Sequence, residues 1–440
     1  MIRKGCLIAL ILLVAVIGVL VAIVLSTPAS SERFALQASP STLAMLRMVP
    51  TDAEEITVIP AAAGLLRDLR DHPVTKDWIG DWQSRNSGRM LPLLLGDADV
   101  VAWRRGDESG YVANPDGLRR TLARLWLAAG RRTEEIRVSD GLLVVGRGST
   151  QPTPPADLPE FLDLAGTLEG HLFFLQRESS ESRYPPIERP AVTSASIMET
   201  DIILSSRSRS SGAMPVQSLP IVAYPRNAML ATAAAASPEW LDRLDRVLPI
   251  KLEGLLDRGA MLALYRVDEK TLVPRVEGIV MLPEGDDPEQ LRSVLDSVVP
   301  RINLGGLGTV TESRRVIRGI EVTRREGFGY ALDFATHQGS VLIAFDKSSM
   351  ERYLSDTLER LDLPPDRTVW FVRVRPTMLS SAVDQLQDRK ELALLVPDVY
   401  DSIRELDRWL EYFHGVSSIV MARLGEEGYD VVTTTISAPK

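Results

Sequence analysis

The feature that most constrains this chain is the unbroken apolar run from Leu7 to Leu25, which holds only Leu, Ile, Val and Ala apart from Gly18. As a helix with a rise of about 1.5 Å per residue, the run reaches ~28 Å, close to the ~30 Å hydrocarbon core of a bilayer. Each Leu, Ile or Val favours membrane insertion by about 0.3–0.6 kcal/mol. The run therefore predicts a transmembrane helix at residues 7–25.

Arg3 and Lys4 are the only charged residues before Glu32. By the positive-inside rule they predict a cytoplasmic N-terminus and a translocated remainder. We therefore expect a single-pass protein of the bacterial inner membrane, with its ectodomain in the periplasm or outside the cell. A cleaved signal peptide is the alternative, because Thr27-Pro28-Ala29 resembles a small-residue cleavage site, although the apolar run exceeds the ~7–15 residues of such a signal.

The composition of the chain is that of a globular protein, with 45% hydrophobic and 25% charged residues. A chain of 440 residues is too long for one core and long enough for two or three domains. Its 59 acidic and 50 basic residues give a net charge of −9, which argues against nucleic acid as a partner. Cys6 is the single cysteine and precedes the apolar run, so the exported part has no disulfides and depends on its hydrophobic core.

The chain that follows the tether alternates between strand and helix patterns. Strands are expected at residues 56–59, 100–103, 111–113 and 142–145, and helices at 61–69 and after Asn114. Asn114 and Pro115 have the residue types of an N-cap and a first helical position. The order strand, helix, strand, strand, helix, strand is that of a ferredoxin-like β-α-β-β-α-β unit.

Landmarks of this unit recur later in the chain. Residues 255–265 (LLDRGAMLALY) align with residues 93–103 (LLLGDADVVAW) without a gap, and Asp287-Pro288 matches Asn114-Pro115. Gln338-Gly339 before a strand echoes Asp140-Gly141. Repetition of several landmarks in one order indicates an internal repeat.

The second copy begins with an expected strand at residues 221–224 and an expected helix at 227–236. A shorter third copy starts at the strand 369–374 and ends in a hairpin that turns at Gly425–Gly428. We therefore predict an α+β fold with two and a half ferredoxin-like repeats behind the transmembrane helix. The predicted organisation is a cytoplasmic tail at 1–6, the transmembrane helix at 7–25, a tether with a short membrane-proximal helix at 26–47, repeat 1 at 48–163, inserted strands and polar loops at 164–214, repeat 2 at 215–364 and a partial repeat 3 at 365–440.

The chain has a single anchor, strands that end at a proline and strands that follow a glycine. In this pattern it resembles a family of bacterial membrane-anchored envelope proteins that is described as a domain of unknown function. The resemblance covers most of residues 45–440 and rests on patterning, not on a diagnostic motif. It implies an envelope location and supplies no catalytic or binding residue.

A search for catalytic and metal-binding patterns yields no site. The histidines His72, His171, His337 and His414 lie in separate parts of the chain without a second ligand at metal spacing, so we interpret them as structural. No G-x-S-x-G motif is present, and the only S-x-x-K match, Ser437 to Lys440, is at the C-terminus.

Other residues of interest have structural interpretations that we prefer. Gly305–Gly308 and Gly327–Gly329 are expected to form turns, because neither stretch has a Walker lysine. The acidic group Glu284, Asp286, Asp287 and Glu289 fits helix capping better than Ca²⁺ binding, and Asp97 and Asp99 fit a loop better than an acid and base pair. Core packing is preferred to a ligand groove for the tryptophans Trp78, Trp82, Trp103, Trp126, Trp240 and Trp409.

The sequence therefore predicts no catalytic, cofactor-binding or metal-binding residue. Our leading hypothesis is a membrane-anchored, extracytoplasmic binding or scaffolding protein of the cell envelope, with a protein, lipid or glycan partner. The alternative is a membrane-tethered hydrolase whose site is assembled from distant residues.

Overall fold

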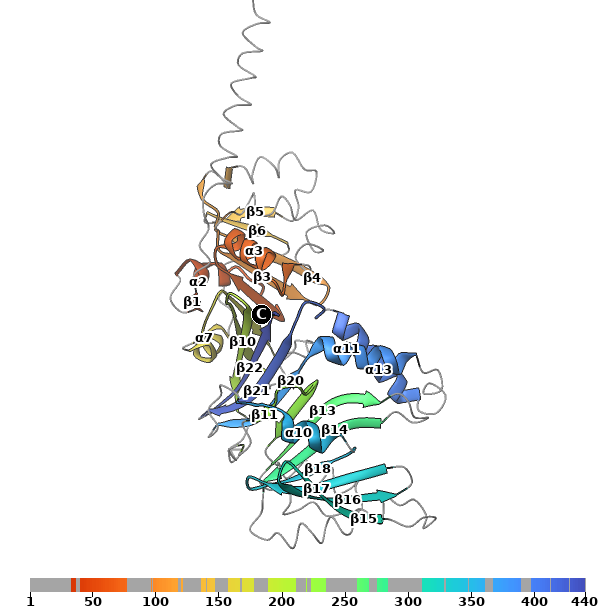
Figure 1. The fold of residues 1–440 in the computed structure, drawn as a ribbon. Coiled ribbons are helices and arrows are strands. Elements are labelled where there is room, and N and C mark those ends of the chain that lie inside the picture. The colour runs from red at the N-terminus through yellow and green to blue at the C-terminus, as the bar shows by residue number, and fades with distance from the viewer. Residues whose placement is uncertain are drawn as a thin grey trace, which may run out of the picture. The chain divides into compact units, whose positions relative to one another are not determined.

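The structure is a computed structural model, and it divides the chain into two compact units, unit 1 at Met1–Ser211 and unit 2 at Gly212–Lys440 (Figure 1). Of the residues that the structure describes, 50% lie in strands and 24% in helices. The residues that the structure describes are 33–36, 40–76, 96, 98–117, 120–121, 136–139, 141–146, 157–166, 168–177, 189–210, 219, 223–234, 259–268, 275–283, 311–327, 330–346, 348–360, 367–388, 397–411, 413–426 and 428–439.

Unit 1 is an antiparallel sheet with helices on both faces. Its elements are β1 (Phe34–Ala35), α2 (Pro40–Leu46), β2 (Glu55–Ile59), α3 (Ala62–Asp71), β3 (Val100–Arg105), β4 (Glu108–Ala113), β5 (Ile136–Ser139), β6 (Leu142–Val145), α7 (Leu158–Ala165), β7 (Glu169–Gly170), β8 (Leu172–Gln176), β9 (Ala191–Ile197) and β10 (Asp201–Arg209). The strand order is β5-β6-β4-β3-β2-β8-β9-β10, and every pairing is antiparallel.

The two faces of the unit 1 sheet differ in what covers them. Leu65 of α3 packs with Leu172 and Ala195 on one face. The other face carries Phe173, whose ring meets that of Phe34 edge-on at 5.0 Å, and α7 packs over β9 and β10. Both layers bury apolar side chains, which is the main source of stability for a sheet of this kind.

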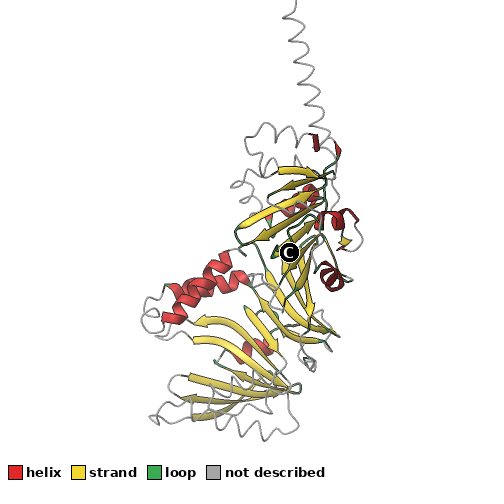
Figure 2. Cartoon of the chain, turned by 180° about the vertical axis from the view of Figure 1, so that it is seen from behind, coloured by secondary structure: helices red, strands yellow, loops and turns green. Residues whose placement is uncertain are grey.

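Unit 2 is a second antiparallel sheet. Its elements are β11 (Ala223–Pro225), β12 (Leu230–Ala234), β13 (Ala260–Asp268), β14 (Arg275–Pro283), β15 (Thr311–Ile317), β16 (Ile320–Gly327), β17 (Tyr330–His337), β18 (Ser340–Ala344), α10 (Ser349–Ser355), β19 (Leu358–Arg360), β20 (Thr368–Val374), α11 (Pro376–Gln387), α13 (Pro397–Glu411), β21 (Ser418–Glu426) and β22 (Tyr429–Ser437). The strand order is β15-β16-β17-β18-β14-β13-β12-β20-β21-β22. Figure 2 draws the strands in yellow and the helices in red.

The core of unit 2 lies on one face of this sheet, where Met350 and Tyr353 of α10 pack against Met281, Leu342 and neighbouring residues. α10 lies over β14 and β18, and β11 pairs with β19 in a separate two-stranded ribbon. The helices α11 and α13 follow β20 and precede β21 in the chain, and they pack against each other.

The two units have the same strand order once the β15–β16 hairpin of unit 2 is set aside. The correspondence extends to single residues, because a row of buried side chains crosses each sheet at equivalent positions. The row meets β6 and β18 at the same distance along the chain after Gly141 and Gly339, and both glycines have positive φ. The row is Phe173, Val58, Val101, Val112 and Val144 in unit 1, and Phe371, Ala233, Met261, Met281 and Leu342 in unit 2.

The predicted α+β fold of two and a half ferredoxin-like repeats is wrong. In a ferredoxin-like unit the two strands joined by a helix run parallel with another strand between them, whereas β2 and β3, which flank α3, are antiparallel neighbours with Ile59 opposite Val100. The strands expected to start a third repeat, β20 to β22, complete the sheet of unit 2. The strands expected as an insertion, β8 to β10, do the same in unit 1.

Two local predictions fail because tertiary pairing outweighs local composition. The alanine-rich stretch at residues 227–236, predicted to be a helix, contains β12, which pairs with β13 on one side and β20 on the other. The polar stretch after Ser205, predicted to be a loop, continues β10 as far as Arg209. In both places the neighbouring strands supply hydrogen bonds and packing that propensity does not anticipate.

The predicted transmembrane helix at residues 7–25 lies outside the described residues. Within the described part of the chain, no helix has both the length and the apolar sequence that crossing a bilayer requires. The predicted single-pass anchor and inner-membrane location therefore find no support among the described helices, and both are withdrawn. The helix expected near a membrane, α2, buries Thr42, Met45 and Leu46 within unit 1.

Candidate functional site

Each unit enters its central strand through the same turn, Pro50-Thr51-Asp52-Ala53 before β2 and Pro225-Arg226-Asn227-Ala228 before β12. The alanine N–H donates to the proline carbonyl at 3.1 Å in unit 1 and 3.3 Å in unit 2. Both alanines are fully buried, so a larger side chain would overpack either turn.

The residue after each turn is held to both neighbouring strands by the same backbone hydrogen bonds. Glu54 in unit 1 and Met229 in unit 2 hold the same place in this pattern. The bonds are Glu54 N–H to Arg104 O (2.8 Å) and Arg177 N–H to Glu54 O (3.0 Å), and Met229 N–H to Leu264 O (2.8 Å) and Arg375 N–H to Met229 O (2.9 Å). The turn is therefore a repeated structural feature, and we call it the Pro-x-Asx-Ala turn.

In unit 1 an arginine clamps this turn. The guanidinium of Arg177 donates through Nη1 to the carbonyl of Ala53, and through Nε and Nη2 to the two carboxylate oxygens of Asp157, with Nη2–Oδ1 at 2.9 Å. Asp157 is the N-cap residue of α7, and its side chain makes no capping hydrogen bond. The two-point bond between guanidinium and carboxylate joins α7, the turn and the end of β8 in one charge-neutral cluster.

In unit 2 Arg373 clamps the corresponding turn without a carboxylate. Arg373 lies on the core face of β20, two residues before Arg375, which is the register equivalent of Arg177. Its Nη1 donates to Ala228 O at 2.8 Å and to Arg226 O at 3.3 Å. The side chain is 3% exposed, and its guanidinium carbon lies 5.3 Å from the centre of the Tyr224 ring. Its buried Nε has no hydrogen-bond partner.

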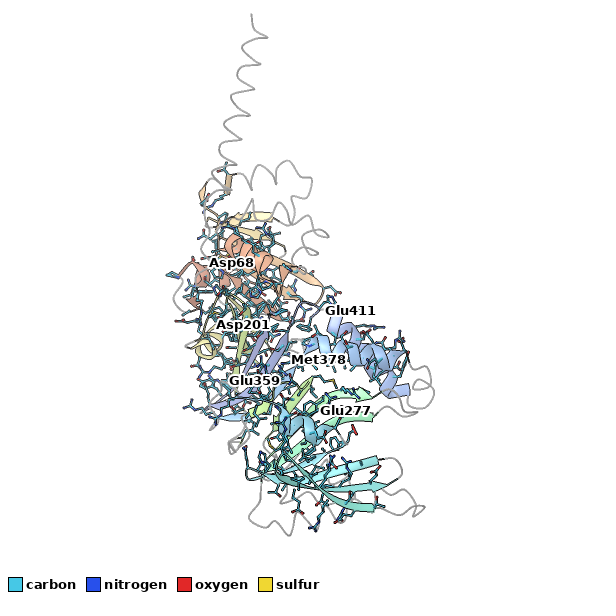
Figure 3. All side chains as sticks on the ribbon, in the orientation of Figure 1. Asp68, Asp201, Glu277, Glu359, Met378 and Glu411 are labelled. Atoms are coloured by element: carbon cyan, nitrogen blue, oxygen red, sulfur yellow. The ribbon has the colours of Figure 1, made fainter. Side chains whose placement is uncertain are left out.

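The electrostatics of Arg373 follow from this burial. Desolvation lowers the pKa of Arg373, and the nearby charge of Arg375 lowers it further. Tyr224, Glu359 and Asp356 oppose the shift through space, and Glu359 is labelled in Figure 3. Glu359 is itself paired with Arg226 at 3.3 Å. Arg373 is therefore a buried cation whose carboxylate neighbours are engaged elsewhere, an arrangement that costs free energy unless an anion compensates it.

Another charged cluster of unit 2 surrounds Asp333, which is fully buried. Arg324 binds both of its oxygens, with Nε–Oδ1 at 2.7 Å and Nη2–Oδ2 at 2.8 Å, and Arg315 adds a third hydrogen bond. Arg315 reaches Asp333 from β15 and also pairs with Glu351 of α10 at 3.3 Å. The cluster holds the β15–β16 hairpin and α10 to the sheet.

A second buried carboxylate is Glu277 of β14, which lies near Arg352 of α10 and is labelled in Figure 3. Arg266 Nε donates to its Oε1 at 2.7 Å, and Arg352 Nε lies 3.3 Å from Oε2 without forming a hydrogen bond. Tyr265 lies beside Arg352, and burial raises the pKa of Tyr265 while its hydroxyl has no hydrogen-bond partner.

Two of the four histidines, His72 and His171, lie against the β9–β10 hairpin of unit 1. His72 Nδ1 accepts the N–H of Val74 at 3.2 Å, and the ring lies beside Met198 and Asp201. His171 Nδ1 accepts the N–H of Ile197 at 2.9 Å. Both rings therefore support the turn between β9 and β10, and burial lowers the pKa of His72 below 6.5 despite the opposing effects of Met198 and Asp201.

We expect the stability of unit 1 to fall as the pH drops below 6.5, because the unfolded chain then binds a proton at His72 that the folded chain resists. Above pH 6.5 the contribution of His72 is complete, and it is lost as the pH falls towards the lowered pKa of the folded state. Urea unfolding at a series of pH values measures this loss. His72→Asn, which keeps an acceptor for Val74, should flatten the profile, and an unchanged profile would contradict the assignment.

The remaining sequence candidates are not brought together in the described residues. Asp99 accepts the Ser41 hydroxyl at 2.7 Å and lies near the start of α3, Trp103 is buried, and no group of His, Cys, Asp and Glu suited to a metal occurs within the described part. His337 ends β17, His414 follows α13, Trp409 belongs to α13, Gly327 ends β16 and Ser437 ends β22. Outside the described residues lie Trp78, Trp82, Asp97, Trp126, Trp240, Glu284, Asp286, Asp287, Glu289, Gly305–Gly308, Phe328, Gly329 and Lys440.

Sequence reasoning missed the charged residues that form these clusters, above all Arg177, Arg373, Glu277 and Asp333. A signal for the clamps was present, because Pro-Thr-Asp-Ala and Pro-Arg-Asn-Ala precede equivalent strands. The buried carboxylates gave no signal, since each meets its arginines only through strand pairing.

No family model matches this chain, and neither a curated protein nor a solved structure is significantly similar to it.

Proposed function

We propose that this chain is a non-catalytic binding or scaffolding protein built from two copies of one antiparallel sheet unit. The observation that carries the proposal is the state of the carboxylates that arginines hold. Asp157 and Asp333 are each held at both oxygens by guanidinium groups, and Glu277 lies between two arginines. Carboxylate oxygens that guanidinium groups engage in this way are poorly placed to exchange protons with a substrate.

A hydrolase with a site assembled from distant residues is the alternative. Glu277 favours it most, because its Oε2 lacks a hydrogen bond and the hydroxyl of Tyr265 is unpartnered nearby. We prefer the binding function, since Glu277 is 2% exposed and lies between Arg266 and Arg352, which leaves a substrate little access to its carboxylate oxygens. Of the partner classes expected from the sequence, an envelope protein, a lipid or a glycan, we propose a protein.

The test is a hydrolysis screen of the purified chain against ester, phosphoester, glycoside and peptide substrates. We expect no turnover above the blank for the wild type, Glu277→Gln and Asp333→Asn. Glu312→Gln is the matched control, because Glu312 also pairs with an arginine but is exposed. Turnover that Glu277→Gln abolishes, with the circular dichroism spectrum and thermal midpoint retained, would establish the hydrolase instead.

A further inference from the structure

The outermost strand of unit 2, β15, has a partner strand on one side only (Figure 1). It pairs with β16, and no other described strand pairs with it. Four residues in succession, Thr311 to Arg314, are exposed, and Val316 is 71% exposed. An edge strand in this state presents backbone N–H and C=O groups to which another strand can bind.

The turn of the β15–β16 hairpin fixes which backbone groups of β15 point outward. Arg318-Gly319 has positive φ at both residues, as in a two-residue type I′ turn, so the flanking residues Ile317 and Ile320 exchange both of their hydrogen bonds. Along an antiparallel ladder such bonded pairs alternate with pairs that do not bond to each other. The N–H and C=O groups that point away from β16 are therefore those of Glu312, Arg314 and Val316.

The hairpin is fixed to the body of unit 2 from its inner face. Arg315 and Arg324 both bind the buried carboxylate of Asp333. Arg315 also pairs with Glu351 of α10 at 3.3 Å. The outer edge of β15 is thus held in place before any partner arrives, which lowers the entropic cost of binding.

The charges on the opposite face of β15 indicate which strand fits this edge. Side chains alternate along a strand, so Glu312 and Arg314 share the face that Arg315 does not occupy. Their side chains are 47% and 63% exposed. When two copies of β15 pair antiparallel about Ser313, Glu312 of each copy lies directly opposite Arg314 of the other. Opposite charges at such positions stabilise a pair of strands.

Other registers of the same pairing are unfavourable. A shift of two residues in one direction places Arg314 opposite itself, and the same shift in the other direction places Glu312 opposite itself. Like charges directly opposite each other destabilise paired strands. The charges of β15 therefore favour one register of one partner, a second copy of the strand.

We propose that β15 pairs antiparallel with β15 of a second copy of this chain, about a two-fold axis at Ser313. Both copies use the same surface, so the contact closes as a dimer. Charged residues on an edge strand usually prevent pairing with other strands. In β15 they exclude most partners and match each other in a single register. This inference rests on the proposed binding function and identifies the protein partner as a second copy.

Charge reversal in the full chain tests the pairing, with sedimentation velocity as the measurement over a range of concentrations. We expect a reversible dimer for the wild type. Glu312→Arg and Arg314→Glu should each weaken association at least tenfold, because each variant places like charges opposite one another twice in the dimer. An equimolar mixture of the two variants should associate as the wild type does, since one then carries two cations where the other carries two anions. Mixing would not rescue a variant that fails to fold.

Disulfide trapping tests the register in a Cys6→Ser background. Ser313→Cys should give a disulfide-linked dimer on mild oxidation, because the two copies of residue 313 face each other at the axis. Thr311→Cys is the matched control on the same strand and face. Its two copies are offset by ~13 Å along the strands, beyond the ~7 Å between Cα atoms that a disulfide can span.

Four results would overturn the inference. They are a wild type that stays monomeric, association that neither single variant weakens, a mixture that does not restore association, and equal trapping at residues 311 and 313. A monomeric chain would leave the proposed function in place, whereas turnover in the hydrolysis screen would remove that function whatever the oligomeric state.

Discussion

Replacement of Asp333 by alanine is expected to lower the free energy of unfolding by about 3–5 kcal/mol, because it leaves the guanidinium groups of Arg315 and Arg324 without their anion in the core of unit 2. Asp333 is 0% exposed, so water does not replace the lost hydrogen bonds. Chemical unfolding, followed by hydrogen exchange so that unit 2 is observed separately, measures the loss.

The matched control for this change is Glu312→Ala. Glu312 pairs with Arg325 at 3.0 Å on exposed strands, and such pairs contribute about 0–1 kcal/mol. A triple variant with Asp333→Leu, Arg315→Met and Arg324→Met should recover much of the stability that Asp333→Ala removes, since no buried charge is then left unpaired. Equal losses for Asp333→Ala and Glu312→Ala would show that the buried cluster is not what holds the hairpin.

Local structure could be predicted where the pattern and the tertiary environment agree. The strands predicted at residues 100–103 and 369–374 lie within β3, Val100–Arg105, and β20, Thr368–Val374. Topology could not be predicted in the same way, because strands of either fold have similar patterns. Only pairing shows that β20 joins β12 instead of starting a new unit.

The internal repeat illustrates the same limit. Residue types along the chain pair the stretch Ile221–Tyr224 with the strand Ile56–Ile59. Strand register instead aligns Pro225 with Pro50, because Ala228 and Ala53 make the same hydrogen bond to that proline. The clamps were harder still, since Arg177 and Asp157 acquire their roles only when β8 and α7 are placed together.

The correspondence of the two buried rows leads to a second prediction, in which the expected loss of unfolding free energy is similar to that for Asp333→Ala. Phe173 and Phe371 hold the same place in their rows, and both are completely buried. Truncation of either ring to alanine should cost about 3–5 kcal/mol, because the change removes transfer free energy and leaves a cavity in a packed core. Phe173→Ala should speed hydrogen exchange in unit 1, and Phe371→Ala should do so in unit 2.

Phe174 provides the control, because it is adjacent to Phe173, points to the opposite face of β8 and is 37% exposed. Phe174→Ala should cost much less than Phe173→Ala, since part of its ring is already in water and its loss leaves a smaller cavity. The comparison tests register directly, because a shift of one residue in β8 would exchange the two faces. A larger loss for Phe174→Ala than for Phe173→Ala would therefore place the wrong residue in the row and remove the basis for equating Phe173 with Phe371.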